Sequence, residues 1–496
     1  MTIELIERAR DFGDRIALEE AGRIINYRQL LDASADLAAA LLGDRGDLEG
    51  ERIAFMAPAS IPYVVMQWAI WRAGAVAVPL NIGASEPELE HVFEVAGIER
   101  LLVPATYRQK VESLCARRGV AMLDPDEINA GDSALPTIAE DRNAMMIFTS
   151  GTTSKPKGVI TSHANIRAQV ETLVTAWEWR ADDSIPLFLP MHHVHGIVNI
   201  LTCALWSGAR VETFPAFDAD AILPRVAEKH YSLFMAVPTI YVKLIQALEN
   251  LGPAERRRCC EGFAAMRLMV SGSAALPVKI HNEWQELTGQ VLLERYGMTE
   301  IGMALSNPLH GERRPGTVGQ PLPGVQVKLV NEEGESVRGE NEPGEIWVKG
   351  PGVFGEYWGR PEATAESFVD DWFRTGDMAV VEDGYYRIMG RLSVDIIKSG
   401  GYKLSALEIE DTLLKHPAIR ECAVVGVEDE TWGEVVAAAV VADGALSLDE
   451  LKSWAREQMS GYKVPRVVRQ VDSLPRNAMG KVTKPAVKRL FAGNAS

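Results

Sequence analysis

Short apolar runs of strand length recur along the first half of this chain, with helical patterns between them. Runs that are apolar throughout are typical of strands buried on both faces, and such strands occur mainly in parallel sheets covered by helices. The sequence therefore predicts an α/β fold with parallel and mixed sheets. The runs that carry this prediction are residues 52–56, 75–80, 101–103, 144–148 and 233–237.

The pattern changes beyond residue 315. Residues 325–330 and 344–349 alternate between apolar and polar side chains, and the charged turn 331–334 follows the first of them. Alternation of this kind predicts half-buried strands in antiparallel hairpins. We therefore expect residues 315–390 to form a small β-rich, barrel-like subdomain of a large N-terminal domain that spans residues 1–390.

A second change occurs near residue 391. Two helical patterns and two strand patterns follow it, at residues 406–414, 421–427, 435–441 and 447–458. These segments suffice for a compact α+β module of about 100 residues. Since a chain of 496 residues is too long for one ordinary core, we expect residues 391–496 to form a separate C-terminal domain.

The overall charge excludes one class of partner. The formal net charge is −17 and no basic tract is present, so no nucleic-acid-binding surface is expected. The most apolar stretch, residues 61–80, contains Gln67, Arg72 and Gly74. It indicates a buried helix that runs into a strand, and no membrane insertion. We expect small-molecule partners, and a chain that is a monomer or a homodimer.

The cysteines and the first residues indicate a compartment. Five cysteines, an odd number without metal-type spacing, are typical of reduced thiols. The first eight residues contain two glutamates and no long apolar run, so a signal peptide is not expected. Together these observations predict a cytoplasmic protein.

The loop at residues 149–158 follows a predicted buried strand and reads Thr-Ser-Gly-Thr-Thr-Ser-Lys-Pro-Lys-Gly. Backbone N–H groups of such a loop can wrap a polyphosphate, and its hydroxyl and ammonium groups are further donors. The spacing is not that of a P-loop. The alternative is a solvated loop without a ligand, because serine, threonine and glycine are common in loops.

Five further polar motifs follow this loop in order. They are Ser-Gly-Ser-Ala-Ala-Leu-Pro at 271–277, Glu-Arg-Tyr-Gly-Met-Thr-Glu at 294–300, Arg-Thr-Gly-Asp at 374–377, Arg391 with the glycine turn in 397–403, and Pro-Arg-Asn-Ala-Met-Gly-Lys at 475–481. With these six motifs the chain resembles the acyl-CoA synthetases of the acyl-adenylate-forming superfamily, over nearly its whole length. Residues 271–277, 293–303 and 394–408 are most similar to the malonyl-CoA synthetase branch.

The resemblance implies a two-step ligase reaction. A carboxylate attacks the α-phosphate of ATP to give an acyl-adenylate, and the thiol of CoA then displaces AMP. The first step builds negative charge on phosphate oxygens, so it calls for Mg²⁺ and cationic side chains. The resemblance thus implies ATP and Mg²⁺ as cofactors and CoA as co-substrate.

The resemblance also assigns roles to residues. The pyrophosphate end of ATP falls to Thr149, Ser150, Gly151, Thr152, Thr153 and Lys157. The residues that it implies for the adenine pocket are Gly272, Ser273, Ala274, Arg295, Tyr296 and Gly297. Those that it implies for the ribose are Asp377 and Arg391. Thr299 would meet the α-phosphate, and Glu300 with Thr149 would hold Mg²⁺, a cation that prefers oxygen ligands.

Three assignments concern domain movement. In the family a mobile lysine, here Lys481, enters the site for adenylation, and the small domain then rotates. The glycine turn with Gly400 and Gly401 would line the pantetheine tunnel for the second step. The family's pivot position holds Ser393 here, where Asp or Lys is usual. The sequence also departs from the family pattern in the phosphate loop, where Ser154 stands at a position that is commonly glycine.

The acid would lie near the segment Leu-Pro-Met-His-His-Val-His-Gly at 189–196. It matches the family's motif along the acyl site, with His193 at the usual position, and His195 is additional. A metal site is the alternative for three histidines in four residues, but the spacing suits neither a helical pair nor a zinc finger.

Arg267 lies inside the otherwise apolar run 266–270. A guanidinium there is costly unless it is paired with an anion. It either forms a structural ion pair with a protein carboxylate or clamps the second carboxylate of a short dicarboxylic acid, together with His195. The resemblance favours malonate or methylmalonate, with Met298 and Met303 limiting the pocket.

Three other functions remain open at this point. One is a synthetase for another short, medium-chain or aryl acid, which Arg267 and His195 argue against. Another is an adenylation domain that loads a carrier protein, but no aspartate for an amino group stands near the histidine segment. The last is a non-catalytic nucleotide-binding relative, which Lys481, Glu300 and Asp377 argue against.

Overall fold

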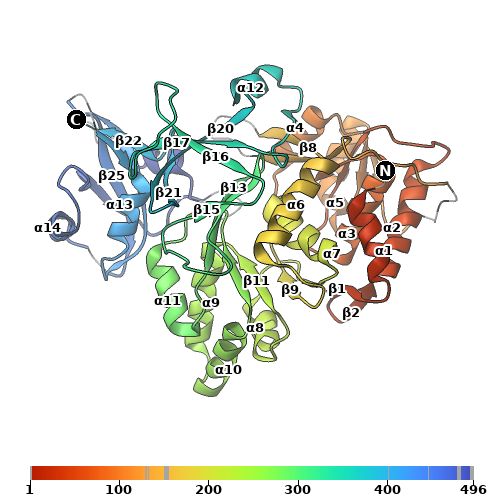
Figure 1. The fold of residues 1–496 in the computed structure, drawn as a ribbon, viewed down its shortest axis with the longest axis horizontal. Coiled ribbons are helices and arrows are strands. Elements are labelled where there is room, and N and C mark those ends of the chain that lie inside the picture. Colours follow the sequence, from red (N-terminus) through yellow and green to blue (C-terminus); the bar gives the residue numbers. More distant parts are fainter. Residues whose placement is uncertain are drawn as a thin grey trace.

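Figure 1 shows a chain built of several sheets with helices packed around them, with the C-terminal module (blue) on the side away from the N-terminus (red). The structure is a computed structural model. It describes residues 3–128, 131, 133–149, 156–399, 402–429, 431–444, 446–476 and 482–491. The predicted α/β class is confirmed.

The largest sheet has seven strands in the order β18-β8-β7-β4-β3-β5-β6. Its core from β7 to β6 is parallel, as the uniformly apolar runs predicted, and β8 joins β7 antiparallel. The strands are β3 (Arg52–Phe55), β4 (Val76–Pro79), β5 (Arg100–Leu102), β6 (Ala121–Leu123), β7 (Asn143–Thr149), β8 (Lys157–Ser162) and β18 (Glu356–Tyr357).

Two smaller sheets complete the body of the N-terminal part. One has the order β2-β1-β10-β9, from β1 (Ile16–Glu20), β2 (Arg23–Asn26), β9 (Ser184–Leu187) and β10 (Arg210–Thr213). The other has the order β11-β12-β13-β14-β15, from β11 (Leu233–Ala236), β12 (Leu268–Ser271), β13 (Leu293–Met298), β14 (Gly302–Ser306) and β15 (Gln320–Pro321). β11, β12 and β13 are parallel, so their carboxyl ends share one edge, where ligands of such sheets bind.

The helices begin where the sequence supplies caps. Asn26 and Gln29 form a capping box at α2, and Ser162 and Asn165 form one at α6. The helices of this part are α1 (Glu4–Phe12), α2 (Tyr27–Leu42), α3 (Ile61–Arg72), α4 (Glu86–Ala96), α5 (Ala105–Arg118), α6 (His163–Trp177), η1 (His195–Thr202), α7 (Cys203–Ser207), α8 (Ala219–Ala227), α9 (Pro238–Asn250), α10 (Pro253–Ala264), α11 (Val278–Thr288) and α12 (Pro361–Glu366). The predicted helix-to-strand stretch is α3 followed by β4. Among the described helices, none has the length and apolar character that a membrane crossing requires.

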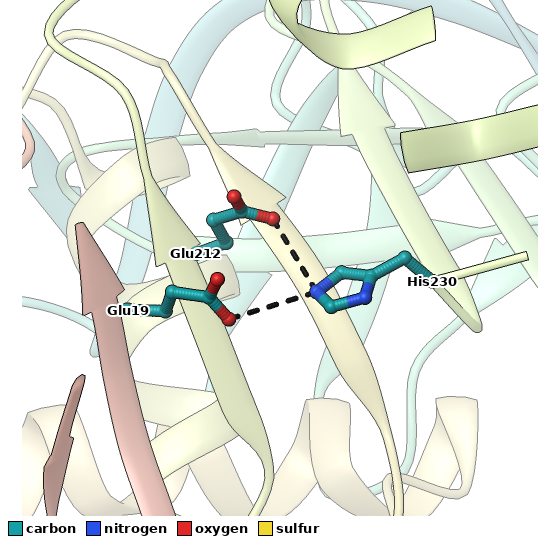
Figure 2. A group of neighbouring side chains, drawn as sticks. All are labelled: Glu19, Glu212 and His230. Atoms are coloured by element: carbon teal, nitrogen blue, oxygen red, sulfur yellow. Dashed lines mark ion pairs between the residues drawn. The ribbon is translucent and has the colours of Figure 1, made fainter. Parts of the chain in front are cut away.

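A charged cluster joins β1, β10 and the segment before β11 (Figure 2). The Nη2 of Arg225 donates 2.8 Å hydrogen bonds to Glu19 and to Glu212. The Nε2 of His230 lies 3.7 Å from an oxygen of Glu19 and 3.5 Å from an oxygen of Glu212, and Tyr231 donates to the same Glu212 oxygen at 2.6 Å. Since Arg225 pairs with both carboxylates and Arg210 lies 3.9 Å from Glu19, we interpret the cluster as an ion-pair network that fastens the three segments together.

The β-rich region contains the predicted antiparallel strands. Its sheet has the order β16-β17-β20-β19, and β21 pairs with β20. No pairing that would close it into a barrel is present within the described residues, so the barrel-like expectation is replaced by an open sheet. The strands are β16 (Gln326–Val330), β17 (Gly344–Lys349), β19 (Phe368–Val369), β20 (Trp372–Glu382) and β21 (Tyr385–Arg391).

The C-terminal module has its own sheet and its own buried clusters, built only from residues beyond 396. Its helices and strands follow the predicted order. They are β22 (Ile396–Ser399), β23 (Tyr402–Ser405), α13 (Ala406–Leu413), β24 (Ile419–Asp429), β25 (Gly433–Ala442), α14 (Leu448–Gln458), β26 (Val467–Gln470) and α15 (Lys484–Arg489).

Candidate functional site

Arg295 on β13 lies against the turn that follows β12. A Cβ atom on Gly272 would come within 2.5 Å of the guanidinium carbon, so only glycine leaves room for Arg295 there. The Nη2 of Arg295 donates a 3.4 Å hydrogen bond to the hydroxyl of Ser273, a residue held at φ = 69°. Positive φ is strained for serine, and such strain is often found at functional sites. The turn is therefore shaped around the guanidinium.

The charge of Arg295 is buried without a matching anion. The residue is 4% exposed, its Nε has no hydrogen-bond partner, and no carboxylate of the described residues lies within ion-pair distance. Burial lowers the pKa of Arg295 to about 10, with Glu294 opposing the shift, so the side chain is still charged at neutral pH. A buried cation in this state favours an anionic ligand.

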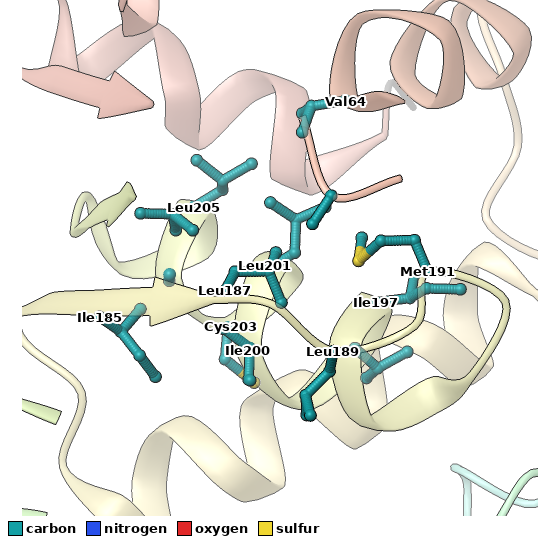
Figure 3. Close-up of a cluster of buried hydrophobic side chains, with 14 of the residues drawn as sticks. Val64, Ile185, Leu187, Leu189, Met191, Ile197, Ile200, Leu201, Cys203 and Leu205 are labelled. Carbon is teal, nitrogen blue, oxygen red and sulfur yellow. The ribbon is translucent and has the colours of Figure 1, made fainter. Parts of the chain in front are cut away.

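His195 approaches the same turn from the other side. Its Nδ1 lies 3.0 Å from the hydroxyl oxygen of Ser273, so Ser273 contacts both His195 and Arg295. His195 begins the π-helix η1, whose eight residues are all buried. Figure 3 shows how the apolar residues of η1 and of the strand β9 before it, including Leu187, Ile197 and Leu201, pack together. This packing fixes the position of His195, and π-helical turns are frequent at functional sites.

The other candidates for the acyl site are His193, which is close to His195 in the sequence, and Met298 and Met303, which lie on β13 and β14. His193 precedes η1, accepts the N–H of Ile197 at 3.1 Å and contacts the ring of His192. Met298 ends β13, and Met303 on β14 is 3% exposed. A Cβ on Gly297 would meet the Met303 methyl group at 2.6 Å, so glycine permits the close β13–β14 approach there.

Asp377 is held by two donors from different segments. The hydroxyl of Tyr296 on β13 donates a 2.6 Å hydrogen bond to Oδ2, and Nε of Arg391 donates a 2.9 Å hydrogen bond to Oδ1. Asp377 and Arg391 face each other in the register of β20 and β21. Burial opposes the charge of Arg391, but Asp377 raises its pKa above the usual value. Arg391 therefore stays charged, and the Asp377 carboxylate is held in one orientation by its two donors.

Glu300 lies in the turn between β13 and β14 and is 5% exposed. The hydroxyl of Tyr357 donates a 3.0 Å hydrogen bond to Oε1, and the ammonium of Lys157 lies 4.5 Å from the centre of the Tyr357 ring. Lys157 pairs in turn with Thr149 across β7 and β8. Burial raises the pKa of Glu300, and Tyr357 opposes the shift. Carboxylate and hydroxyl oxygens are donors that Mg²⁺ prefers, so Glu300 and Thr149 fit that ion by their chemistry.

Arg267 requires a correction. Its Nε donates a 2.7 Å hydrogen bond to Asp183 Oδ1, its Nη2 pairs with Oδ2, and its Nη1 donates a 2.8 Å hydrogen bond to the carbonyl of Trp177. It also precedes β12, whereas the turn with Ser273 follows that strand. The guanidinium is thus saturated by protein groups at the wrong end of the strand. Of the two interpretations of Arg267, the structure supports the structural ion pair with a protein carboxylate. It does not support a clamp for the second carboxylate of the substrate.

Several expected site residues lie outside the described part of the chain. They are Ser150, Gly151, Thr152, Thr153, Gly400, Gly401 and Lys481, together with Ser154. The described ends of the phosphate loop, Thr149 and Lys157, are paired with each other. Gly272, Ser273, Ala274 and Thr299 lie at the carboxyl edge of β12 and β13, as the motifs predicted.

Sequence reasoning missed three partners. Asp183 binds Arg267, Tyr357 binds Glu300, and Glu294 accepts the N–H of Leu276 at 3.1 Å. Asp183 and Arg267 each stand just before a buried strand, β9 and β12, but these strands belong to different sheets, so the sequence does not bring the two residues together. Nothing in the sequence around Tyr357 indicates that its hydroxyl contacts Glu300.

Known proteins resemble this chain over most of its length. The profile of the AMP-binding enzyme family matches residues 5–358, and that of the AMP-binding enzyme C-terminal domain matches residues 408–481. A malonate–CoA ligase of Xenopus laevis, described as mitochondrial, is 43% identical, over 97% of this chain and 91% of its own length. A malonate–CoA ligase of Arabidopsis thaliana is 40% identical, over 96% of this chain and 86% of its own length. ATP-bound MatB from Rhodopseudomonas palustris has a TM-score of 0.90 and 34% identity, and the match covers 100% of both chains.

Proposed function

Because this chain belongs to the AMP-binding enzyme family, we propose that it is an ATP-dependent malonate–CoA ligase. Malonate and ATP give malonyl-adenylate and pyrophosphate, and CoA then gives malonyl-CoA and AMP. The names of the relatives that match over nearly the whole chain support this substrate. The observation that carries the proposal is the buried guanidinium of Arg295, which no carboxylate of the described residues neutralises.

Arg295 takes the role that the sequence suggested for Arg267. One carboxylate of malonate must reach the α-phosphate of ATP, and the other must be desolvated somewhere in the acyl site. Arg295, with Ser273 and His195 beside it, supplies charge-assisted donors for that second carboxylate. A fatty acid would leave this cation buried and unpaired, which costs several kcal/mol, roughly 3–5. The site therefore selects for a short dicarboxylate.

The nucleotide would bind along the same sheet edge. Asp377, oriented by Tyr296 and Arg391, offers a carboxylate to the two ribose hydroxyls. Gly272, Ser273, Ala274 and Gly297 contribute backbone near the adenine. Thr299 would meet the α-phosphate, and Glu300 with Thr149 would hold Mg²⁺. When bound, that ion offsets the negative charge that develops on the phosphate oxygens.

The remaining assignments are proposals that rest on the motifs. Ser150, Gly151, Thr152, Thr153 and Lys157 bind the pyrophosphate end of ATP. Lys481 stabilises the adenylation transition state, Gly400 and Gly401 line the path of the CoA thiol, and His193 lines the acyl site. The C-terminal domain, residues 391–496, turns about Ser393 between the two steps.

Compartment and assembly stay as expectations. All five cysteines lie in the described residues and none forms a disulfide, in keeping with reduced thiols. We propose a cytoplasmic monomer or homodimer with small-molecule substrates and no nucleic-acid partner.

A substrate panel tests the proposal. Purified protein is given ATP, Mg²⁺ and CoA with malonate, methylmalonate, acetate, octanoate or benzoate, and both pyrophosphate and thioester are measured. We expect malonate, and to a lesser degree methylmalonate, to give both products. Products from a monocarboxylate but not from malonate would identify a synthetase for another short, medium-chain or aryl acid instead.

A further inference from the structure

A buried lysine near the C-terminus joins three segments of the C-terminal module. The ammonium of Lys484 on α15 pairs with Glu410 on α13, lies 3.5 Å from Asp395, and donates a 2.7 Å hydrogen bond to the carbonyl of Val424 on β24. The side chains of Lys484, Glu410 and Asp395 are only 13%, 15% and 15% exposed. Glu410 also accepts the N–H of Val424 at 2.6 Å. The three charges therefore form a compact buried network.

This network lies close in the sequence to residues 477–481, which carry Lys481 and are outside the described part of the chain. The described residues on either side of 477–481 are paired with each other: Arg476 bridges to Val482, and the N–H of Thr483 donates to Pro475 at 2.9 Å. Arg476 also donates a 2.6 Å hydrogen bond to Glu421 on β24. The described residues that flank 477–481 are thus anchored: Arg476 by Glu421, and Lys484, three residues after Lys481, by the buried network.

The other end of the network lies at the proposed hinge. The Asp395 carboxylate accepts a 3.0 Å hydrogen bond from the backbone N–H of Arg391. The backbone N–H of Asp395 donates a 2.8 Å hydrogen bond to the carbonyl of Arg391. A Cβ on Gly390 would come within 2.3 Å of the Asp395 Cβ, so the chain is closely packed at this turn. Asp395 therefore fixes the backbone that follows Arg391 and passes through Ser393.

We propose that Lys484 is a positioning residue for adenylation: it locks the Lys481 segment to the end of the hinge, so that domain rotation delivers Lys481 to one fixed place. The apolar packing of Val487 and Phe491 against β24 and β25 also holds α15 to the module, but Lys484 supplies its charged link to Asp395 at the hinge. The inference rests on the proposed role of Lys481, and it holds for whichever acid is activated.

Replacing Lys484 with methionine keeps the length of the side chain and removes the charge. We expect Lys484→Met to slow adenylation, measured as pyrophosphate release in a single turnover, by about 10- to 100-fold, because misplacement by about 1 Å has an effect of this order. Thioester formation from pre-made acyl-adenylate should change less than about twofold, since Lys481 is not needed for that step. Lys484→Arg, which keeps the charge, should recover most of the adenylation rate.

Two further variants separate positioning from stability. Lys488→Met is the matched control, because Lys488 lies on the same helix, pairs with Glu434 at 3.3 Å and is 45% exposed; it should leave both steps unchanged. Lys484→Met combined with Glu410→Gln removes two of the three buried charges and should raise the melting temperature above that of the single variant, in which Glu410 stays charged without Lys484. Its adenylation should stay slow.

The opposite pattern would overturn the inference. If both steps fall together in Lys484→Met, and the double variant restores them together with the melting temperature, Lys484 only stabilises the module. Both steps are measured with an acid that the wild-type protein activates. If the wild-type protein activates another acid but not malonate, the proposed substrate is refuted, and the Lys484 variants can still be compared with that other acid.

Discussion

The hydroxyl of Tyr296 donates a 2.6 Å hydrogen bond to Asp377, although the two residues lie 81 positions apart and on different sheets. Arg391 holds the second oxygen of the same carboxylate. Both oxygens are thereby oriented before a nucleotide arrives, which lowers the ordering cost of binding.

Removing the phenol hydroxyl should weaken ATP binding. We expect Tyr296→Phe to raise the KM for ATP about tenfold, because a hydrogen bond to a charged group contributes roughly 1.5 kcal/mol or more. The kcat should change little. Steady-state kinetics with varied ATP check this, with Tyr385→Phe as the control, since that hydroxyl donates to the carbonyl of Glu312. An unchanged KM would mean that Asp377 is held well enough by Arg391 alone.

Loss of Arg267 should reduce stability and leave acid selectivity unchanged. Asp183 has a side chain only 3% exposed, so Arg267→Ala would leave a buried, unpaired carboxylate. The expected loss in the free energy of unfolding is about 3–5 kcal/mol. Chemical denaturation measures it, and Arg180→Ala, which removes an exposed ion pair, should cost less than about 1 kcal/mol. A selective rise in the KM for malonate without loss of stability would instead support Arg267 as the residue that binds the second carboxylate.

Glu294 should make stability depend on pH. Burial raises its pKa to about 8, although the N–H of Leu276 and Arg295 oppose the shift. Between the ordinary value of 4.5 and about 8, the folded protein binds a proton that the unfolded chain has lost. The contribution of Glu294 is therefore complete below pH 4.5 and is lost as pH rises to 8, by up to about 1.4 kcal/mol per pH unit.

Glu294→Gln tests this, because the amide keeps an acceptor for Leu276 but does not titrate. Melting temperatures at pH 5 to 8 should fall less steeply for Glu294→Gln than for wild type, and the exposed Glu286→Gln should follow wild type. Parallel curves for all three proteins would show that Glu294 is already ionised across this range.

The α/β class and the strand runs could be predicted because buried parallel strands are apolar throughout, which is visible in one sequence. The two-residue strands β15, β18 and β19 could not, since so short a segment has no periodicity. The π-helix at residues 195–202 was missed because all eight of its positions are buried, including the polar His195, Asn199 and Thr202, so no exposed polar face marks it as a helix.

Several motif residues, among them Gly272 and Thr299, directly follow buried strands or lie just beyond them, and their roles stay predictions; the sequence could not show which single arginine faces a ligand. Arg267 and Arg295 both stand in or beside apolar strands, and sequence spacing does not say which of them faces a ligand. The direction of the sheet does, because the site lies where β12 ends and Arg267 lies where it begins. Arg295 lies beside that carboxyl end, against Gly272.

The kcat/KM for malonate divided by that for propionate, in wild type and in Arg295→Met, tests recognition of the second carboxylate most directly. Methionine keeps an unbranched side chain beside Gly272 and removes the cation. We expect wild type to favour malonate strongly and the variant to lower the ratio by at least about 30-fold, since a buried charged hydrogen bond is worth roughly 2–5 kcal/mol when one partner is lost. An equal loss for both acids, with the ratio unchanged, would contradict the assignment of Arg295 and with it the structural basis for malonate.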